Sequence, residues 1–385
     1  MSNESIRNPF VFGRIAQGEA FVNRTKEVAG LVRDLADHEK VFLLSPRRYG
    51  KTSLIAEAFR RLEAKGFRTV TIQVSSSTTY TQFLERFATE VVRVAGTWEQ
   101  IKVAVTTFLR EVKPIFKFDG MREELQLSFT RSHDFDPVPV APEVFALPER
   151  MASHGGFRMA ICLDEFQDVA KFNGGSVENA LRDAVQRQER VGYVFSGSKT
   201  SMLEEMRASD RPFHKAGPTR YLDKIPAAEW HPFIAKQFMD RGRGITRKTI
   251  DHLLITADLV PYLVQRIAHE LWDAAELSQA ETLDVNNVDA VVSEILSEDG
   301  PEYEQKWQSF TAGQQSVLAA LAAGERAMHS KAAQARYEIG PQSSISTALQ
   351  LLGAHDVIAK HGKSYAFVDP LFPLWILEHK AGSRK

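Results

Sequence analysis

The residue types best suited to chemistry stand in the loop of residues 45–53, Ser-Pro-Arg-Arg-Tyr-Gly-Lys-Thr-Ser. Gly-Lys-Thr is typical of a phosphate-binding loop, although Ser45 replaces the first glycine of the usual pattern. In such a loop Gly50 lets the backbone approach the phosphates, Lys51 contacts the β- and γ-phosphates, and Thr52 binds Mg²⁺. The loop predicts contacts to ATP or ADP from Pro46, Arg47, Arg48, Tyr49, Gly50, Lys51, Thr52 and Ser53.

The segments on either side must place this loop between a strand and a helix. Residues 41–44 form an apolar run that predicts a short buried strand, and residues 53–65 carry apolar side chains at helical spacing. A helix that begins there directs unpaired N–H groups and the positive end of its dipole toward a bound phosphate. An ordinary strand-to-helix turn with a surface lysine is the alternative. Two roles are equally compatible with Arg47 and Arg48. They could contact phosphate or a partner domain, or they could be solvated charges that pair with a nearby acid.

Two acids, Asp164 and Glu165, follow a second apolar run at residues 159–163. The first acid would hold Mg²⁺ through its water shell, and the second would polarise the attacking water. Ligands of parallel sheets bind beyond the carboxyl ends of the strands, so the loop and the acids can converge. We therefore predict that Lys51, Asp164 and Glu165 are catalytic and that Thr52 and Asp164 bind the metal. A pair of solvated acids is the alternative.

A third apolar run, residues 191–195, ends in Ser196-Gly197-Ser198. A hydroxyl at this strand end would sense the γ-phosphate or position water, and Ser198 is our candidate, with Ser196 as the alternative. A simple strand-terminating turn is equally compatible with Ser-Gly. Apolar strands that alternate with helical segments predict a parallel sheet with helices on both faces.

The coarse pattern predicts three domains. Residues 1–225 form the α/β nucleotide-binding domain, with an insertion at about 97–140 that holds a helical stretch at 98–112 and a hairpin around Asp119-Gly120. Residues 226–300 form an all-α domain. Residues 301–385 show three short helices followed by a hairpin at 357–368, which is the outline of a winged helix. The four helices expected in the all-α domain span 226–240, 246–256, 260–277 and 285–297.

Several motifs together resemble the archaeal-type AAA+/STAND ATPases found in archaea and bacteria. They are Phe21-x-Asn23-Arg24, the loop from Ser45 to Leu54, Leu163-Asp164-Glu165-Phe166-Gln167, Ser196-Gly197-Ser198 and the tail from Val368 to Trp375. The resemblance runs from about Asn8 to Trp375. It implies an AAA+-like α/β domain, a helical lid and a C-terminal winged helix.

The resemblance also implies roles for residues outside the loop. It suggests that Asn23 and Arg24 lie near the adenine and that Arg220 reaches phosphate in cis or from a neighbouring subunit. It matches Pro261 with a Gly-x-Pro lid motif that contacts nucleotide, with Leu259 at the glycine position. Arg266, in the same expected helix, is a candidate lid sensor.

Bulk composition narrows the class of protein. The apolar content of 43% and charged content of 25% in 385 residues are those of a globular protein. The net charge of −1 implies no global attraction to nucleic acid or anionic membrane. The single cysteine, Cys162, excludes an intrachain disulfide and a cysteine-based zinc site, and we interpret it as a buried hydrophobe. No apolar run suggests a membrane span or a signal peptide, so we expect a cytoplasmic protein.

The function predicted from these patterns is a Mg²⁺-dependent ATPase that acts as a nucleotide-driven switch. The winged helix would bind DNA or a protein partner, and the oligomeric state stays open. The expected recognition helix, residues 343–352, has no Lys or Arg, so its base contacts would come from Gln342, Ser343, Ser344, Ser346 and Gln350. Phosphate contacts would come from Arg336, Lys360, His361 and Lys363. The alternatives are a nucleotide-locked regulator with negligible turnover and, less favoured, a small-molecule kinase.

Overall fold

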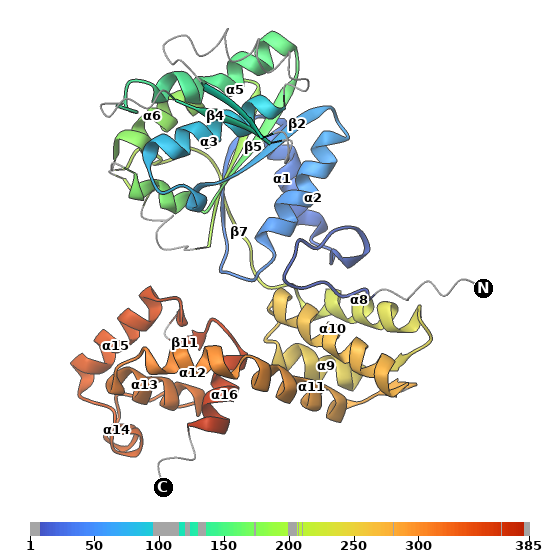
Figure 1. The fold of residues 1–385 in the computed structure, drawn as a ribbon. Helices are drawn as coiled ribbons and strands as arrows, with labels where there is room; N and C mark the ends of the chain where they lie inside the picture. The colour runs from blue at the N-terminus through green and yellow to red at the C-terminus, as the bar shows by residue number, and fades with distance from the viewer. Residues whose placement is uncertain are drawn as a thin grey trace. The chain divides into compact units, whose positions relative to one another are not determined.

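A computed structural model describes residues 8–94, 115–119, 124–129, 136–172, 175–198, 206, 208–209, 211–279, 281–362 and 364–380 (Figure 1). The chain divides into two compact units, Asn23–Asp223 and a second that combines Met1–Val22 with Lys224–Lys385. The helix expected at 98–112 and the contact expected from Lys363 lie outside the described residues.

The unit Asn23–Asp223 is built on a five-stranded sheet in the order β2-β5-β6-β1-β7, with every neighbouring pair parallel. Its strands are β1 (Lys40–Leu44), β2 (Phe67–Gln73), β5 (Arg158–Asp164), β6 (Val191–Gly197) and β7 (Thr219–Tyr221). The central strands β5 and β6 are almost entirely buried, as unbroken apolar runs predict for strands covered on both faces. The predicted α/β class is confirmed.

Helices cover the two faces of this sheet. One face carries α1 (Thr25–Ala36) and α2 (Lys51–Glu63), which pack on each other and on the strands. The other face carries α3 (Tyr80–Arg93), α5 (Ala141–Gly155) and α6 (Gly175–Gln186), whose apolar sides form one large core with the sheet (Figure 1). Two short 3₁₀ turns, η2 (Val74–Ser76) and η3 (Phe166–Lys171), follow β2 and β5 at the carboxyl edge of the sheet.

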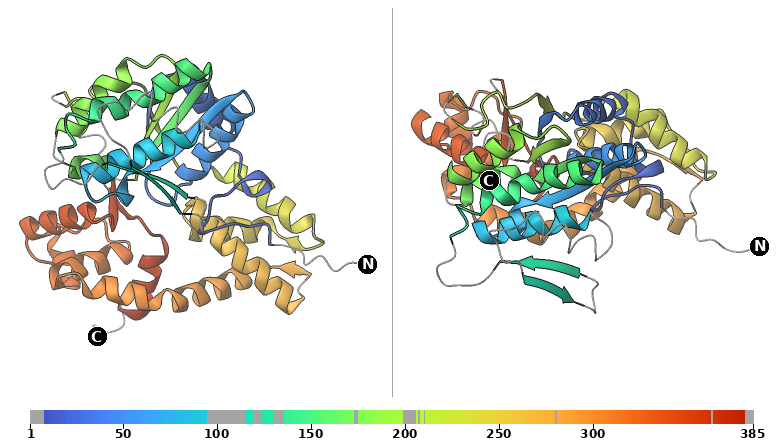
Figure 2. Two further views of the ribbon diagram at one scale, coloured as in Figure 1. Left: turned by 45° about the horizontal axis from the view of Figure 1, so that its top comes forward. Right: turned by 90° about the horizontal axis from the view of Figure 1, so that it is seen from above.

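The insertion contains the antiparallel hairpin that Asp119-Gly120 predicts, made of β3 (Ile115–Asp119) and β4 (Glu124–Ser128). Figure 2 shows it in its right-hand view as two opposed arrows. Side chains of α3 hold the chain of β4 at its end. The Leu127 N–H donates to Thr89 Oγ1 at 3.1 Å, and the Phe129 N–H donates to Glu85 Oε1 at 2.7 Å. Hydrogen bonds from α3 therefore satisfy backbone donors of the hairpin.

After Asp223 the second unit continues with four helices, α8 (Ala227–Met239), α9 (Arg247–Thr256), α10 (Pro261–Ser278) and α11 (Val285–Glu298). Each lies within two residues of its predicted range. A pair of two-residue strands, β8 (Gly244–Ile245) and β9 (Thr282–Leu283), was not expected. The N-terminal segment packs on α10, where the Val11 N–H donates to Gln265 Oε1 at 3.0 Å and His269 Nδ1 lies 2.7 Å from the Phe10 carbonyl oxygen. The sequence pattern had grouped that segment with the α/β domain.

The same unit ends in the elements of a winged helix. These are α13 (Ala312–Ala322), α14 (Lys331–Tyr337), α15 (Gln342–Ala354) and the hairpin of β10 (Ile358–His361) and β11 (Ser364–Phe367). They confirm the predicted outline. Two flanking helices, α12 (Gly300–Gln308) and α16 (Leu371–His379), meet through the rings of Tyr303, Phe372 and Trp375, in which Phe372 stacks on both of the others. Across the described part of the chain, no helix combines the length and apolarity that crossing a bilayer requires.

Candidate functional site

The phosphate-loop sequence runs from the end of β1 to the start of α2, as predicted. Gly50 has a φ of 82° and Arg48 a φ of 70°, so two residues of the loop adopt the left-handed conformation. That conformation suits glycine and is strained for arginine. A Cβ at Gly50 would meet no atom within 4 Å. Glycine is therefore favoured at this position by its positive φ and not by a lack of space. The loop delivers the chain to Lys51, the first residue of α2.

Lys51 meets both acids of the second motif. Its Nζ lies 3.4 Å from Asp164 Oδ1 and 3.5 Å from Glu165 Oε1. The lysine is 8% exposed, and within the described residues its Nζ makes no hydrogen bond. Asp164 ends β5, and Glu165 follows in a left-handed turn with a φ of 52°. The structure thus brings the three predicted catalytic side chains together at the carboxyl edge of the sheet.

Strand β6 lies between β5 and β1, and Ser196 within it and Ser198 directly after it each serve one acid. Ser196 Oγ donates to Asp164 Oδ1 at 2.5 Å. Ser198 donates to Glu165 Oε2 twice, from Oγ at 2.8 Å and from its N–H at 3.2 Å. The sequence favoured Ser198 with Ser196 as the alternative, whereas the structure gives both serines a partner in the acid pair. Leu163 is paired with Phe195 in the sheet register, so the chain after β5 and the chain of β6 run side by side. The earlier serine therefore reaches the earlier acid, and the later serine reaches the later acid.

Glu165 is held in its ionised form. Burial raises the pKa of its carboxyl group, but the Lys51 ammonium and hydrogen bonds from Gln167 and Ser198 outweigh burial and bring the pKa below its ordinary value. Gln167 Nε2 donates to Glu165 Oε2 at 2.5 Å. Sequence reasoning included Gln167 only as part of a motif. Gln167 stands two residues after Glu165 in a turn, and this short spacing could have predicted its hydrogen bond to the Glu165 carboxylate.

Cys162 touches this cluster through Ser196 alone among the described hydrogen bonds. The thiol is fully buried, and its Sγ lies 3.6 Å from Ser196 Oγ. Burial and the nearby Asp164 carboxylate raise the pKa of Cys162 to about 12, so the thiol stays protonated near neutral pH. This agrees with its interpretation as a buried hydrophobe.

Arg24 contacts the backbone of the phosphate loop. Its guanidinium is buried, and Nη2 donates to the Tyr49 carbonyl at 2.9 Å and to the Asp223 carbonyl at 2.7 Å. Asn23 is exposed, and its Oδ1 accepts from Thr25 Oγ1 at 2.5 Å. The structure therefore gives Arg24 a part in holding the loop that its predicted place near the adenine did not suggest.

The other loop residues divide by exposure. Tyr49 is buried, Pro46 and Ser53 are half-buried, and Arg47, Arg48 and Thr52 are exposed. The side chain of Thr52, in the first turn of α2, is thus accessible to a metal. Within the described residues no group of three or more His, Cys, Asp or Glu side chains could hold a metal ion. A Mg²⁺ site here would therefore need phosphate oxygens or water besides Thr52 and Asp164.

Arg220 and Pro261 do not join the Lys51 cluster in the described contacts. Arg220 on β7 pairs with Asp34 of α1, with Nε 2.7 Å from Oδ2. Pro261 is buried as the first residue of α10, in the other unit. Leu259 just before it has a φ of 57°, the backbone conformation that glycine favours, at the glycine position of the lid motif. Arg266 Nη2 donates to Asp299 Oδ1 at 3.0 Å.

Comparisons with known proteins agree with this architecture. Residues 301–378 match the family model of a probable winged helix domain. No curated protein matches the chain. A Walker-type ATPase of Pyrococcus abyssi is similar over 94% of this chain and 97% of its own, with a TM-score of 0.64 and 14% identity.

The ORC2 protein of Aeropyrum pernix, solved in ADPNP-ADP complexes, is similar over 98% of this chain and 100% of its own, with a TM-score of 0.59 and 13% identity. Both likenesses span the sheet, the helical segment and the C-terminal domain, so they bear on the whole architecture and not on one part of it. This chain therefore shares the fold of these two structures, which confirms the predicted AAA+-like fold class, and residues 301–378 complete it as a winged-helix domain.

Proposed function

We propose that this chain binds ATP with Mg²⁺ and hydrolyses it, and that the nucleotide state acts as a switch. The observation that carries the proposal is the Lys51 ammonium, buried beside two carboxylates and without a hydrogen bond among the described residues. The two ion pairs offset part of the cost of burying this ammonium, but its N–H donors still lack hydrogen bonds, and that is costly. Phosphate oxygens are the acceptors that its place at the start of α2 favours, because N–H groups of the first helical turn converge there.

The surrounding residues fit the same ligand. Gly50 leaves open space where a side chain would stand, and the exposed Arg47 and Arg48 supply positive charge to the loop. Thr52 and Asp164 would hold Mg²⁺, and Ser196 fixes the Asp164 carboxylate through its hydrogen bond. When bound, Mg²⁺ neutralises charge on the phosphates during transfer.

Glu165 is the base in this proposal. Its lowered pKa keeps it ionised at neutral pH, so it can orient the attacking water and accept a proton from it. Oε2 is engaged by Ser198 and Gln167, which leaves Oε1, the atom nearer to Lys51, as the oxygen for water. Lys51 would then shift its contact from the carboxylates to the phosphates as nucleotide enters.

One observation favours the slower alternative, a nucleotide-locked regulator. Glu165 Oε2 accepts three hydrogen bonds, from Gln167 Nε2 and from the Oγ and N–H of Ser198. Each bond to the ionised form lowers the basicity of the carboxylate, and general-base catalysis weakens as the pKa falls away from the working pH. Turnover can therefore be slow while the nucleotide still binds tightly.

The winged helix is proposed to bind DNA or a protein partner. On α15 the side chains of Gln342, Ser343, Ser344, Ser346 and Gln350 are exposed, as a recognition face requires. Arg336 and Lys360 are exposed nearby in sequence on α14 and β10. The uncharged polar face suits hydrogen bonds to bases or to a protein, and the few cations would limit affinity for DNA.

The enzyme is tested by phosphate release from the full chain with Mg-ATP, beside calorimetric titration with Mg-ADPNP. We expect steady release that Glu165→Gln removes, while ADPNP binds the variant as tightly as the native chain. Tight binding with no release by the native chain would establish the regulator instead. Absence of heat with ADPNP would refute both.

A further inference from the structure

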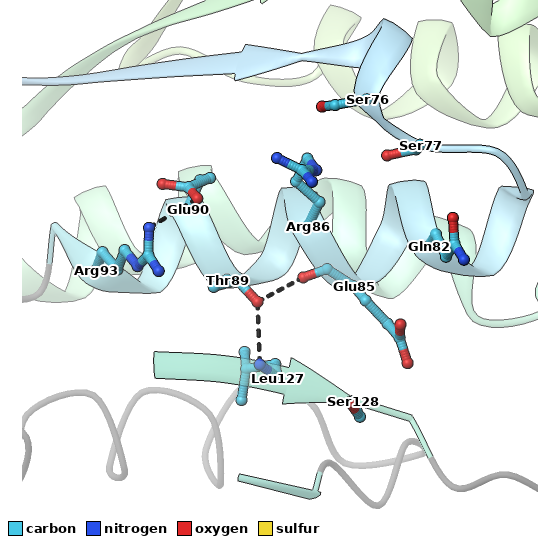
Figure 3. A pocket seen from close by; sticks show the side chains of 10 residues that line it. All are labelled: Ser76, Ser77, Gln82, Glu85, Arg86, Thr89, Glu90, Arg93, Leu127 and Ser128. Carbon is cyan, nitrogen blue, oxygen red and sulfur yellow. Dashed lines mark hydrogen bonds and ion pairs between the residues drawn. The ribbon is translucent and has the colours of Figure 1, made fainter. Parts of the chain in front are cut away.

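A polar cavity of about 470 Å³ lies between α3, β4 and η2, within the unit Asn23–Asp223 (Figure 3). Its volume falls in the range of small-molecule sites. None of its described lining residues belongs to the phosphate loop, and neither Asp164 nor Glu165 lines it. The cavity is therefore separate from the proposed nucleotide site.

The cavity contains a buried polar group that lacks a partner. Ser77 is 7% exposed, and its Oγ makes no hydrogen bond with any described residue. Buried hydroxyl groups in folded proteins are nearly always paired, since an unpaired one loses its contact with water and gains nothing in return. A bound molecule that reaches Ser77 would supply the missing partner.

Arg86 brings to the cavity a guanidinium that forms no ion pair with a described acid, although Glu85 and Glu90 also belong to the lining. Figure 3 shows its guanidinium extending from α3 toward the turn that carries Ser77. The side chain is exposed and has no ion pair or hydrogen bond in the described part of the chain. The other charged groups of the lining are engaged, because Arg93 donates to Glu90 Oε1 at 2.8 Å and Glu85 Oε1 accepts the Phe129 N–H at 2.7 Å.

Gln82 adds further donors. Its Oε1 accepts from the Thr78 N–H at 3.0 Å and from Thr78 Oγ1 at 2.8 Å, so the carboxamide oxygen is occupied and the NH₂ group stays available. The Arg86 guanidinium, the Gln82 NH₂ group and the Ser77 hydroxyl thus all lack a described partner. Such donors together match an oxyanion.

We propose that this cavity binds the oxyanion group, a phosphate or a carboxylate, of a small polar molecule. Ser77 and Arg86 are the contacts on which recognition depends, and Gln82 assists. The cavity adjoins the strand beside the acid pair, because Ser76 Oγ donates to the Gln73 carbonyl at 2.7 Å and Gln73 is paired with Asp164 in the sheet register. An occupant is therefore placed to influence ATP turnover, and only this last point rests on the proposed function.

The test titrates the full chain with inorganic phosphate and, in parallel, with acetate at constant ionic strength, followed by NMR chemical shifts. Mg-ADPNP is kept at saturation so that the phosphate loop is filled. We expect saturable binding of one of the two anions, weakened about 10-fold by Arg86→Gln and by Ser77→Ala. The better-bound anion identifies the group. Arg33→Gln removes the same charge from an exposed position of α1 and should leave binding unchanged.

Two results would overturn the proposal. One is the absence of saturable binding of either anion, and the other is equal weakening by Arg86→Gln and Arg33→Gln, which would mean diffuse attraction by surface charge. Thermal unfolding of Ser77→Ala confirms that the variant is folded. Repeating the titration in Lys51→Ala without nucleotide separates the two sites. A failure to bind ADPNP would then refute the nucleotide site, while anion binding in this cavity would still be measured independently.

Discussion

The Lys51 cluster and the exposed face of α15 are two polar regions built in opposite ways. In the cluster, Lys51 and both serines are buried, and each half-buried carboxylate is held by a specific serine. On α15 the polar side chains face solvent, and Ser346 and Thr347 satisfy their hydroxyl groups on carbonyl oxygens of their own helix. Side chains held in fixed positions by buried hydrogen bonds suit few reactions or ligands, whereas side chains that face solvent can contact many partners.

The difference extends to the backbone. Arg48, Gly50 and Glu165 all have positive φ values, and in the two non-glycine residues this conformation is strained. Surrounding contacts must hold such residues in place. The regular turns of α15 need no such support. The contrast predicts that substitutions in the cluster act on specific steps of ATP turnover, whereas substitutions on α15 change affinity for a partner gradually.

The largest expected effect is that of Lys51→Ala. Removing the buried ammonium takes away a phosphate contact and leaves two carboxylates facing each other, so we expect kcat/KM for ATP to fall by about 10²–10³-fold. Phosphate release measures it. Lys65→Ala, an exposed lysine just beyond the end of α2, is the matched control and should behave as the native chain. A Lys51→Ala protein that retained most of its activity would remove the cluster from the mechanism.

Arg24→Gln tests the support of the loop. The buried guanidinium loses its hydrogen bonds to the Tyr49 and Asp223 carbonyls, so we expect the unit Asn23–Asp223 to lose about 2 kcal/mol of stability. Denaturant unfolding, with hydrogen exchange in β1 and β6 to report on this unit, measures the loss. Arg33→Gln, in the helix that Arg24 precedes and 70% exposed at its side chain, should change stability by less than about 0.5 kcal/mol. Equal losses would show that Arg24 has no special role.

Ser198→Ala is expected to have a smaller, pH-dependent effect. The depressed pKa of Glu165 contributes stability above the unfolded-state pKa, which is lost as pH falls through the folded pKa. Removing one donor raises the folded pKa. The acid limb of the kcat profile should therefore move to higher pH, and kcat should fall up to about 10-fold.

Ser196→Ala is the control for this prediction. Ser196 donates to Asp164 and not to Glu165. Its removal should therefore weaken Mg²⁺ binding, so that more Mg²⁺ is needed for half-maximal activity, and leave the acid limb of the kcat profile in place. If both variants shifted the limb equally, the separate partners seen for the two serines would have no functional meaning.

Much of this molecule could be predicted from sequence because its patterns are local. Apolar runs located β1, β5 and β6, and helical spacing located α8 to α11 to within two residues. The convergence of loop and acids followed from the rule that parallel strands present their carboxyl ends at one edge. Strand β7 was missed, since a three-residue edge strand carries too few apolar residues to show a pattern.

Pairings between distant residues could not be predicted. The bonds from Ser196 and Ser198 depend on β6 lying between β5 and β1, and strand order is not written in any single segment. The pair of Arg220 with Asp34 joins residues 186 positions apart. The place of residues 8–22 beside α10 rests on bonds such as that of Val11 to Gln265. Many polar residues could partner each of these groups, and only the fold selects among them.

The smallest expected effect is on the winged helix, where Lys360→Gln separates the DNA and protein alternatives. If DNA is bound, losing one phosphate contact should weaken binding for all sequences alike and reduce the salt slope by about 1. Fluorescence anisotropy of a labelled duplex over a range of salt concentrations measures this. Gln350→Ala, on the exposed face of α15, is the companion variant and should leave the salt slope unchanged, because it removes no charge. No binding at low salt, with or without nucleotide, would exclude DNA and leave a protein as the partner of this face.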